Sequence, residues 1–217
     1  MSEALPLVFH ESRIQEIKSA IKNPQEIWLL HGYGSHQDDL FGFAPYLSKD
    51  YRIRSLRAPH PIGGGGFAWY ELSFDFQGIR KTNEEEAQAS IMRIAEGLAW
   101  HQREYPLAPR PVLFGFSQGG ILANAMASLH PGLMRAVISI ASYYPLEWTF
   151  LSHNRPAIPQ FAAVGTEDGV VQSTLSLPSY DRAQREFGRE LTVKSYPMPH
   201  TISPSCFRDV MAWLKDL

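Results

Sequence analysis

A ten-residue stretch, Pro111 to Gly120 (P-V-L-F-G-F-S-Q-G-G), constrains the fold of this chain more than any other. It begins with an apolar run that is too short for a helix and is typical of a buried strand. Gly115 and Gly119 flank Ser117, and helix-forming residues follow at positions 121–127. A strand, a G-x-S-x-G turn and a helix are the context of a nucleophile elbow, which lifts a serine hydroxyl above the sheet. An ordinary strand-to-helix turn is the alternative, and the flanking elements favour the elbow.

Apolar runs of strand length alternate with helical segments along the rest of the chain. Strands are expected at 27–30, 51–56, 112–114, 136–140, 158–164 and 191–196, and the clearest helices at 83–105 and 203–215. This alternation predicts an α/β fold with a mostly parallel sheet and helices on both faces, joined by right-handed crossovers. No linker, repeat or long charge run interrupts the sequence, so we expect one domain over residues 1–217 without a separate cap domain.

The N-terminal segment has the least regular pattern. The apolar run at 7–9 indicates an edge strand. Ile14, Ile17 and Ile21 recur at helical spacing, which predicts a helix over 12–22 with Ser12 as its N-cap.

A serine nucleophile needs a base to remove its proton, and that base needs an orienting acid. The order Ser, Asp, His along the chain is typical of α/β-hydrolases. His200 lies directly between the last strand and the last helix and is the favoured base, whereas His153 lies in a polar connection. Asp168 follows a strand and is flanked by glycine, which makes it the favoured acid. Glu167 is the alternative, because the sequence does not fix which carboxylate points inward.

A second glycine-rich turn, His31-Gly32-Tyr33-Gly34, follows the strand at 27–30. Such a turn exposes backbone N–H groups at the rim of a sheet, where they suit the stabilisation of an oxyanion. His31 is interpreted as structural. The loops that carry Tyr33, Ser117, Asp168 and His200 all follow predicted strands, and sites in parallel sheets gather beyond the carboxyl ends of the strands.

Residues 60–81 are expected to form one long loop with four consecutive glycines at 63–66. Long loops within compact domains are often functional. Phe67, Trp69 and Tyr70 are therefore predicted to wall an apolar substrate pocket. The alternative is an aromatic cluster that seals the edge of the sheet.

Two further features have structural explanations. The triplet Glu84-Glu85-Glu86 suggests metal ligands, but acidic residues in the first turn of a helix explain it better. No metal site is predicted. Cys206 is preceded by no elbow and is interpreted as structural.

Composition excludes several classes of function. A net charge of −2 gives no strong attraction to nucleic acid, and no apolar run approaches the ~20 residues that a membrane helix needs. A single cysteine excludes an internal disulfide, and the acidic N-terminus lacks the apolar segment of a signal peptide. We expect a cytoplasmic protein with no nucleic-acid partner and no stable membrane insertion. The sequence does not predict an oligomeric state.

The sequence resembles the phospholipase/carboxylesterase family of compact α/β-hydrolases, which includes acyl-protein thioesterases. The resemblance rests on the following motifs: L-H-G-Y-G at 30–34, R-A-P at 57–59, G-G-F-A-W-Y at 65–70, G-F-S-Q-G-G at 115–120, G-x-x-D-x-V-V at 165–171 and H-T-I at 200–202. It implies Ser117, Asp168 and His200 as a triad and the N–H groups of Tyr33 and Gln118 as the oxyanion hole. It also implies ester or thioester substrates and no cofactor.

The chain departs from the family pattern at two places. Pro199 precedes His200 where the family commonly has glycine, which predicts a stiffer histidine loop. The N-terminal strands common in the family are weak in this sequence.

The favoured function is a serine carboxylesterase that hydrolyses small to medium esters through an acyl-enzyme. An acyl-protein thioesterase or lysophospholipase is the second hypothesis and would need a longer acyl channel. A noncatalytic binding module with the same fold is the third, because fold alone does not establish activity.

Overall fold

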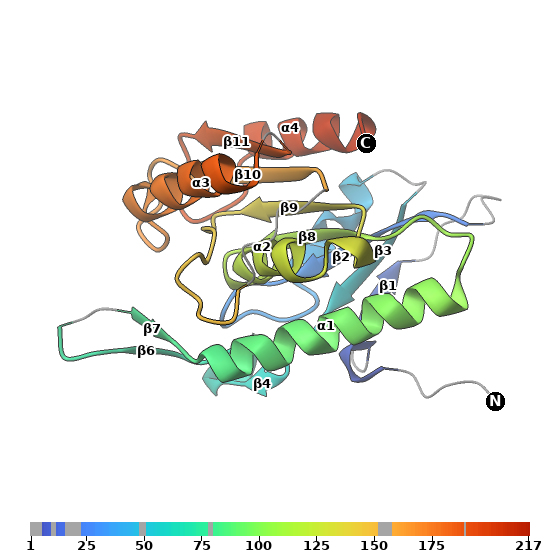
Figure 1. Cartoon of the computed structure of the whole chain (residues 1–217), viewed down its shortest axis with the longest axis horizontal. Helices are drawn as coiled ribbons and strands as arrows, with labels where there is room; N and C mark the ends of the chain where they lie inside the picture. The colour runs from blue at the N-terminus through green and yellow to red at the C-terminus, as the bar shows by residue number, and fades with distance from the viewer. Residues whose placement is uncertain are drawn as a thin grey trace.

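The computed structural model describes residues 6–9, 12–15, 23–47, 51–77, 80–151, 158–188 and 190–217. At its centre is a seven-stranded sheet in the order β1-β3-β2-β8-β9-β10-β11 (Figure 1). Its strands are β1 (Arg13–Gln15), β2 (Gln25–Leu30), β3 (Tyr51–Leu56), β8 (Val112–Phe116), β9 (Ala136–Ile140), β10 (Gln160–Gly165) and β11 (Leu191–Tyr196). β1 pairs antiparallel to β3, and the other neighbours pair in parallel. The mostly parallel sheet predicted from the sequence is confirmed.

Helices cover both faces of this sheet, as predicted. The α-helices of the described residues are α1 (Glu84–Glu104), α2 (Gln118–Leu129), α3 (Ser173–Phe187) and α4 (Pro204–Lys215). Along β2, Trp28 and Leu30 belong to a core cluster that includes side chains of α1, α2 and α3. Ile27 and Leu29 belong to the cluster on the other face, which includes side chains of α4 and of the 3₁₀ helix η2 (Leu40–Tyr46). The alternation of side chains along a strand explains why this short apolar run supplies both layers of the core.

The segment expected as one long loop forms two small antiparallel hairpins instead. β4 (His60–Pro61) pairs with β5 (Phe67–Ala68), with the 3₁₀ turn η3 (Gly63–Gly65) between them. β6 (Leu72–Phe74) pairs with β7 (Arg80–Thr82), and this hairpin projects from the body of the molecule (Figure 1). The pairing satisfies backbone groups that a structureless loop would leave to water.

The N-terminal predictions were wrong in the residues that the structure describes. Residues Leu7–Phe9 form a 3₁₀ turn, η1, and not an edge strand. The Phe9 ring packs edge-on against Trp28, with 5.2 Å between the ring centroids. This packing against a core side chain explains the apolar run without a strand.

Residues Arg13–Gln15 were expected in a helix and form β1. Ser12 does not cap a helix: its hydroxyl donates to the carbonyl of Phe9 at 2.9 Å. Ile14 is 44% exposed, so the apolar spacing did not mark a buried helix face. Backbone pairing along the open edge of β3 decides the conformation here. Residues 16–22 lie outside the described residues.

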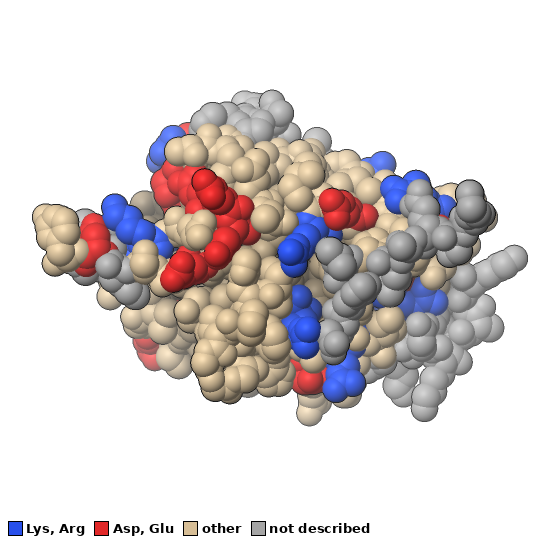
Figure 2. Space-filling view, turned by 90° about the horizontal axis from the view of Figure 1, so that it is seen from below, with Lys and Arg blue, Asp and Glu red and all other residues tan. Residues whose placement is uncertain are grey.

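Charges of both signs lie on the surface, and the formal net charge of the chain is −2. On the face seen in Figure 2, acidic side chains gather in a patch toward the hairpin end, and basic side chains are scattered from that end to the opposite one. Among the described helices, none is both long and apolar enough to cross a bilayer.

A buried ionic cluster lies at the amino end of β2. The carboxylate of Glu26 is fully buried, accepts a hydrogen bond from the Trp28 indole at 2.8 Å and lies 3.0 Å from Arg52. Arg54 and His101 approach the same carboxylate to 3.5 and 3.3 Å. Burial alone would raise the pKa of Glu26, but His101, Arg54 and the Trp28 N–H outweigh burial and lower it to about 2.

This cluster makes the fold sensitive to acid. A carboxyl whose pKa falls on folding stabilises the fold above its unfolded pKa, and the contribution disappears as the pH falls through the folded pKa. For Glu26 the window runs from 4.5 down to about 2. The full contribution is on the order of 3 kcal/mol.

We expect Glu26→Gln to lower the Tm at pH 7 by roughly 10 °C, because the basic partners lose their buried counter-charge. The difference from the wild type should shrink as the pH falls below 4.5. Thermal unfolding at several pH values measures this, with the exposed Glu96→Gln on α1 as the matched control. A difference in Tm that stays constant across pH would contradict the assignment.

Candidate active site

Ser117 occupies a strained turn between β8 and α2. Its backbone has φ 52° and ψ −118°, in the positive-φ region that residues with a Cβ rarely adopt. The flanking glycines are required by close approaches. A Cβ on Gly115 would lie 2.3 Å from the carbonyl oxygen of Gly119, and one on Gly119 would lie 2.1 Å from that of Leu30. The backbone N–H of Ser117 donates to the carbonyl of Ile140 at 2.9 Å, which ties the turn to β9.

The structure brings Ser117, His200 and Asp168 into one chain of contacts. The Nε2 atom of His200 lies 3.0 Å from Ser117 Oγ, and its Nδ1 lies 2.7 Å from Asp168 Oδ2. The Asp168 side chain is fully buried, whereas that of His200 is 20% exposed. A serine beside an imidazole that is held by a buried carboxylate is the arrangement that activates a hydroxyl for nucleophilic attack.

Two backbone groups hold Asp168 in this position. Its second carboxylate oxygen, Oδ1, accepts hydrogen bonds from the N–H groups of Val170 and Val171, both at 2.8 Å. This leaves Oδ2 directed at His200. Glu167, the alternative acid, is exposed, and the rival base His153 lies outside the described residues.

The loops after β10 and β11 are bonded to each other. The N–H of Thr166 donates to the carbonyl of Tyr196 at 2.8 Å, and that of Glu167 donates to Met198 at 3.3 Å. At Pro199, the residue that departs from the family pattern, the carbonyl accepts from the Thr201 N–H at 2.7 Å. The His200 ring lies 4.9 Å from the Phe116 ring, measured between centroids. The base is therefore supported by backbone bonds and by ring packing.

The residues expected to supply the oxyanion N–H groups, Tyr33 and Gln118, belong to segments next to Ser117. Gln118 is the first residue of α2, where N–H groups have no partner within the helix. Tyr33 follows Gly32, and a Cβ on Gly32 would be 3.3 Å from the Cβ of Ser117. The turn after β2 thus packs directly against the elbow, next to the serine.

Trp69 joins these two N–H-bearing segments. Its backbone N–H donates to the Gln118 side-chain oxygen at 2.8 Å, and its indole N–H donates to the His31 carbonyl at 2.9 Å. The Gln118 side chain also donates to the carbonyl of Tyr70 at 2.8 Å. His31 is fully buried, as its structural interpretation requires, and burial lowers its pKa to about 4. Its Nε2 accepts from Ala58 N–H, so Nδ1 carries the proton and donates to Gly32.

This network corrects the prediction made for the aromatic residues. Trp69 and Tyr70 are each only 1% exposed and belong to the core, so they do not wall a substrate pocket. Backbone groups of Trp69 and Tyr70 bond to the Gln118 side chain, and the Trp69 indole bonds to the turn after β2, so both rings lie inside. Phe67 is half-buried and lies under the guanidinium of Arg57, which is 4.5 Å from the ring centroid.

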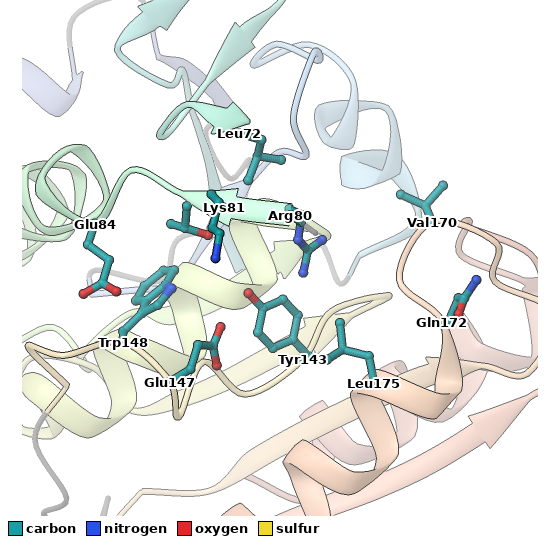
Figure 3. Close-up of a pocket in the computed structure, with 11 residues that line it drawn as sticks. Leu72, Arg80, Lys81, Glu84, Tyr143, Glu147, Trp148, Val170, Gln172 and Leu175 are labelled. Atoms are coloured by element: carbon teal, nitrogen blue, oxygen red, sulfur yellow. The ribbon is translucent and has the colours of Figure 1, made fainter. Parts of the chain in front are cut away.

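Two cavities lie near the triad. The first, of about 370 Å³, is lined by Ser117, His200, Phe116 and residues of the turn after β2. The second, of about 750 Å³, lies between the β6–β7 hairpin, the segment after β9 and the loop after Asp168 (Figure 3). The sequence did not reveal the second cavity, because its walls come from four separate segments. In the sequence, the one indication of this cavity was the position of Tyr143 just after the predicted strand at 136–140.

Other candidate groups have structural roles. Glu84, Glu85 and Glu86 form the first turn of α1, capped by Asn83, whose side chain accepts from the Glu86 N–H. This confirms the helix-start interpretation. No group of three or more potential metal ligands is found among the described residues. Cys206 is fully buried, and burial, together with Asp209, raises the pKa of its thiol to about 12. It is a poor nucleophile.

Known proteins resemble this chain over nearly its whole length. The family model described as "Phospholipase/Carboxylesterase" matches residues 12–217. Acyl-protein thioesterase 1 of Mycosarcoma maydis is 23% identical over 224 residues, covering 91% of this chain and 93% of the relative. The structure of acyl-protein thioesterase 2 of Zea mays has a TM-score of 0.76 at 20% identity, with 94% and 97% of the two chains covered. The carboxylesterase of Bacillus cereus has a TM-score of 0.77 at 19% identity, with 94% and 93% covered.

The structural neighbours share the fold, and the family model extends over β1 and every later strand of the central sheet. The segments that it spans include the elbow, the acid loop and the histidine loop. The chain therefore belongs to the phospholipase/carboxylesterase family of α/β-hydrolases.

Proposed function

We propose that the protein is a serine carboxylesterase that hydrolyses small to medium carboxylic esters through an acyl-enzyme. The observation that carries this proposal is the continuous contact from Asp168 through His200 to Ser117, at 2.7 and 3.0 Å. Family membership supports the reaction class. The small cavity around Ser117, of about 370 Å³, suits an ester with a short acyl or alcohol part.

The mechanism follows from the two nitrogen atoms of His200. Nε2 removes the proton of Ser117 as Oγ attacks the ester carbonyl carbon, while the Nδ1 proton remains shared with Asp168. The negative charge on the carbonyl oxygen is stabilised by the N–H groups of Tyr33 and Gln118. His200 then gives its proton to the leaving alcohol. A water molecule, deprotonated by the same nitrogen, attacks the acyl-enzyme and releases the acid.

A thioesterase acting on acylated proteins is the second candidate. The observation that favours it is the similarity to curated acyl-protein thioesterases. The same triad cleaves an oxygen ester or a thioester, since both react at the acyl carbon. Rates on matched oxygen and sulfur esters of one acid, over a series of chain lengths, separate the two candidates.

Ser117→Ala should lower kcat for p-nitrophenyl butyrate by on the order of 10⁴-fold or more while the protein stays folded, by analogy with other triad knockouts. A fluorophosphonate probe should label the wild type at Ser117 and not the variant. Ser205→Ala, in the first turn of α4, is the matched control. A wild-type protein that is folded but is neither labelled nor active would instead indicate the noncatalytic binding module.

Asp168→Asn should lower kcat by up to about 10⁴-fold, because the neutral amide holds the wrong His200 tautomer. The neighbouring Glu167→Gln is the matched control, since that side chain is exposed, and it should stay within about twofold of the wild type. Steady-state rates on both purified variants, with their Tm values, test the assignment. If Glu167→Gln lost activity and Asp168→Asn did not, the roles would be reversed.

Trp69→Phe should lower kcat by roughly tenfold with little change in KM. The substitution removes the N–H that holds the His31 carbonyl, and so loosens the turn that presents the Tyr33 N–H to the oxyanion. Affinity for a trifluoromethyl ketone, whose adduct carries an oxyanion, should fall in parallel. Trp100→Phe on α1 is the matched control, because its indole N–H has no acceptor among the described residues. A lowered Tm with unchanged kcat would mean that Trp69 serves only the core.

A further inference from the structure

Two residues that line the larger cavity are hydrogen-bonded to segments of the candidate active site. Val170 lines it, and the N–H of Val170 donates to the carboxylate of Asp168 at 2.8 Å. Tyr143 also lines it, and its carbonyl accepts from Asn124 on the elbow helix at 3.0 Å. This cavity of about 750 Å³ therefore lies beside the segments that carry Asp168 and the elbow helix.

The lining of this cavity combines aromatic and aliphatic side chains with polar and charged ones. Tyr143 and Trp148 form a buried floor, and Leu72 and Leu175 add aliphatic surface. Arg80 reaches over this floor from the β6–β7 hairpin, with its guanidinium 5.0 Å from the centroid of the Tyr143 ring (Figure 3). The ring and the hydroxyl of Tyr143 both hold this guanidinium, and its remaining N–H groups suit a planar anion.

A second donor is directed into the same space. Trp148 is 3% exposed, and its indole N–H has no acceptor among the described residues. Figure 3 shows its nitrogen turned toward the middle of the cavity, on the side of Tyr143 and Lys81. A buried N–H without an acceptor is costly, so a ligand that supplies an acceptor gains from this position. Lys81 stands at the rim, paired at 3.6 Å with Asp75.

Two carboxylates also line the cavity, those of Glu84 and Glu147. Glu84 lies at the far end beyond Trp148, and its carboxylate accepts hydrogen bonds from the Thr149 N–H at 2.9 Å and hydroxyl at 2.6 Å. Glu147 is exposed, but its carboxylate and the guanidinium of Arg80 both interact with the hydroxyl of Tyr143. On the opposite side of Arg80, toward Val170, the labelled wall residues carry no negative charge (Figure 3).

We propose that this cavity binds a carboxylate at the distal end of the substrate, with Arg80 as the specificity-determining residue. The proposal rests on the esterase function proposed above and names its substrate class: monoesters whose acyl part ends in a second carboxylate. A guanidinium binds a carboxylate through two parallel N–H···O bonds, which gives orientation as well as affinity. The apolar walls hold the methylene chain between the two ends.

The test compares three methyl esters of equal chain length: monomethyl adipate (anionic), methyl hexanoate (neutral) and methyl 6-aminohexanoate (cationic). Hydrolysis is followed by titration at constant pH. We expect kcat/KM for monomethyl adipate to exceed the other two by about tenfold or more, the scale of one charge-assisted contact. If turnover of methyl esters is slow, the inhibition constants of the same three compounds against p-nitrophenyl acetate give the same comparison.

Arg80→Gln should abolish this preference by raising KM for monomethyl adipate, and should leave methyl hexanoate within about twofold. Arg80→Lys, which keeps the charge but not the planar fork, should retain part of the preference. The matched control is Arg93→Gln on the exposed face of α1, which changes the net charge equally. Tm values of all variants establish that they fold.

Equal rates on the three esters, a preference for the amino ester, or an equal loss on all three in Arg80→Gln would overturn this inference and leave the esterase proposal standing. Absence of hydrolysis, of inhibition and of fluorophosphonate labelling at Ser117 would overturn both.

Discussion

The close approach of three backbone segments at the elbow governs the rest of the structure. The carbonyl of Leu30 lies so close to Gly119 that no Cβ fits there, and the carbonyl of Gly119 excludes a Cβ at Gly115 in the same way. This contact packs the start of α2 against the ends of β2 and β8 and keeps Ser117 at φ 52°. Strain of this kind costs on the order of 1–3 kcal/mol and persists only where the surroundings over-determine it. The surrounding sheet does so by bonding Ser117 to β9.

Packing and chemistry are served by the same residues. Trp69 is a core side chain, yet its two N–H groups bond to Gln118 and to the carbonyl of His31. The two segments that carry the proposed oxyanion N–H groups are therefore held by one buried residue, through its backbone N–H and its indole N–H. This preorganisation is of value because donors that are already fixed need no rearrangement as negative charge develops.

The two ends of strand β2 have different roles. Glu26, near its amino end, sits in a buried cluster with Arg54 and His101, which contributes to stability. The turn after Leu30, at its carboxyl end, lies against Ser117. In a parallel sheet all carboxyl ends meet at one edge, so the reactive groups gather there and the structural ion cluster lies at the other end.

Local pattern was sufficient for the parallel sheet, the elbow at Ser117 and the helix that starts at Glu84, because strand and helix periodicity and tight turns depend on neighbouring residues. The sequence could not decide which carboxylate meets His200. Two backbone N–H groups orient Asp168, and Glu167 faces outward. It also misplaced Trp69 and Tyr70, since burial depends on partners about 50 residues away at Gln118. The edge strand β1 and the cavity under Arg80 arise only when distant segments meet, and no local pattern encodes such long-range contacts.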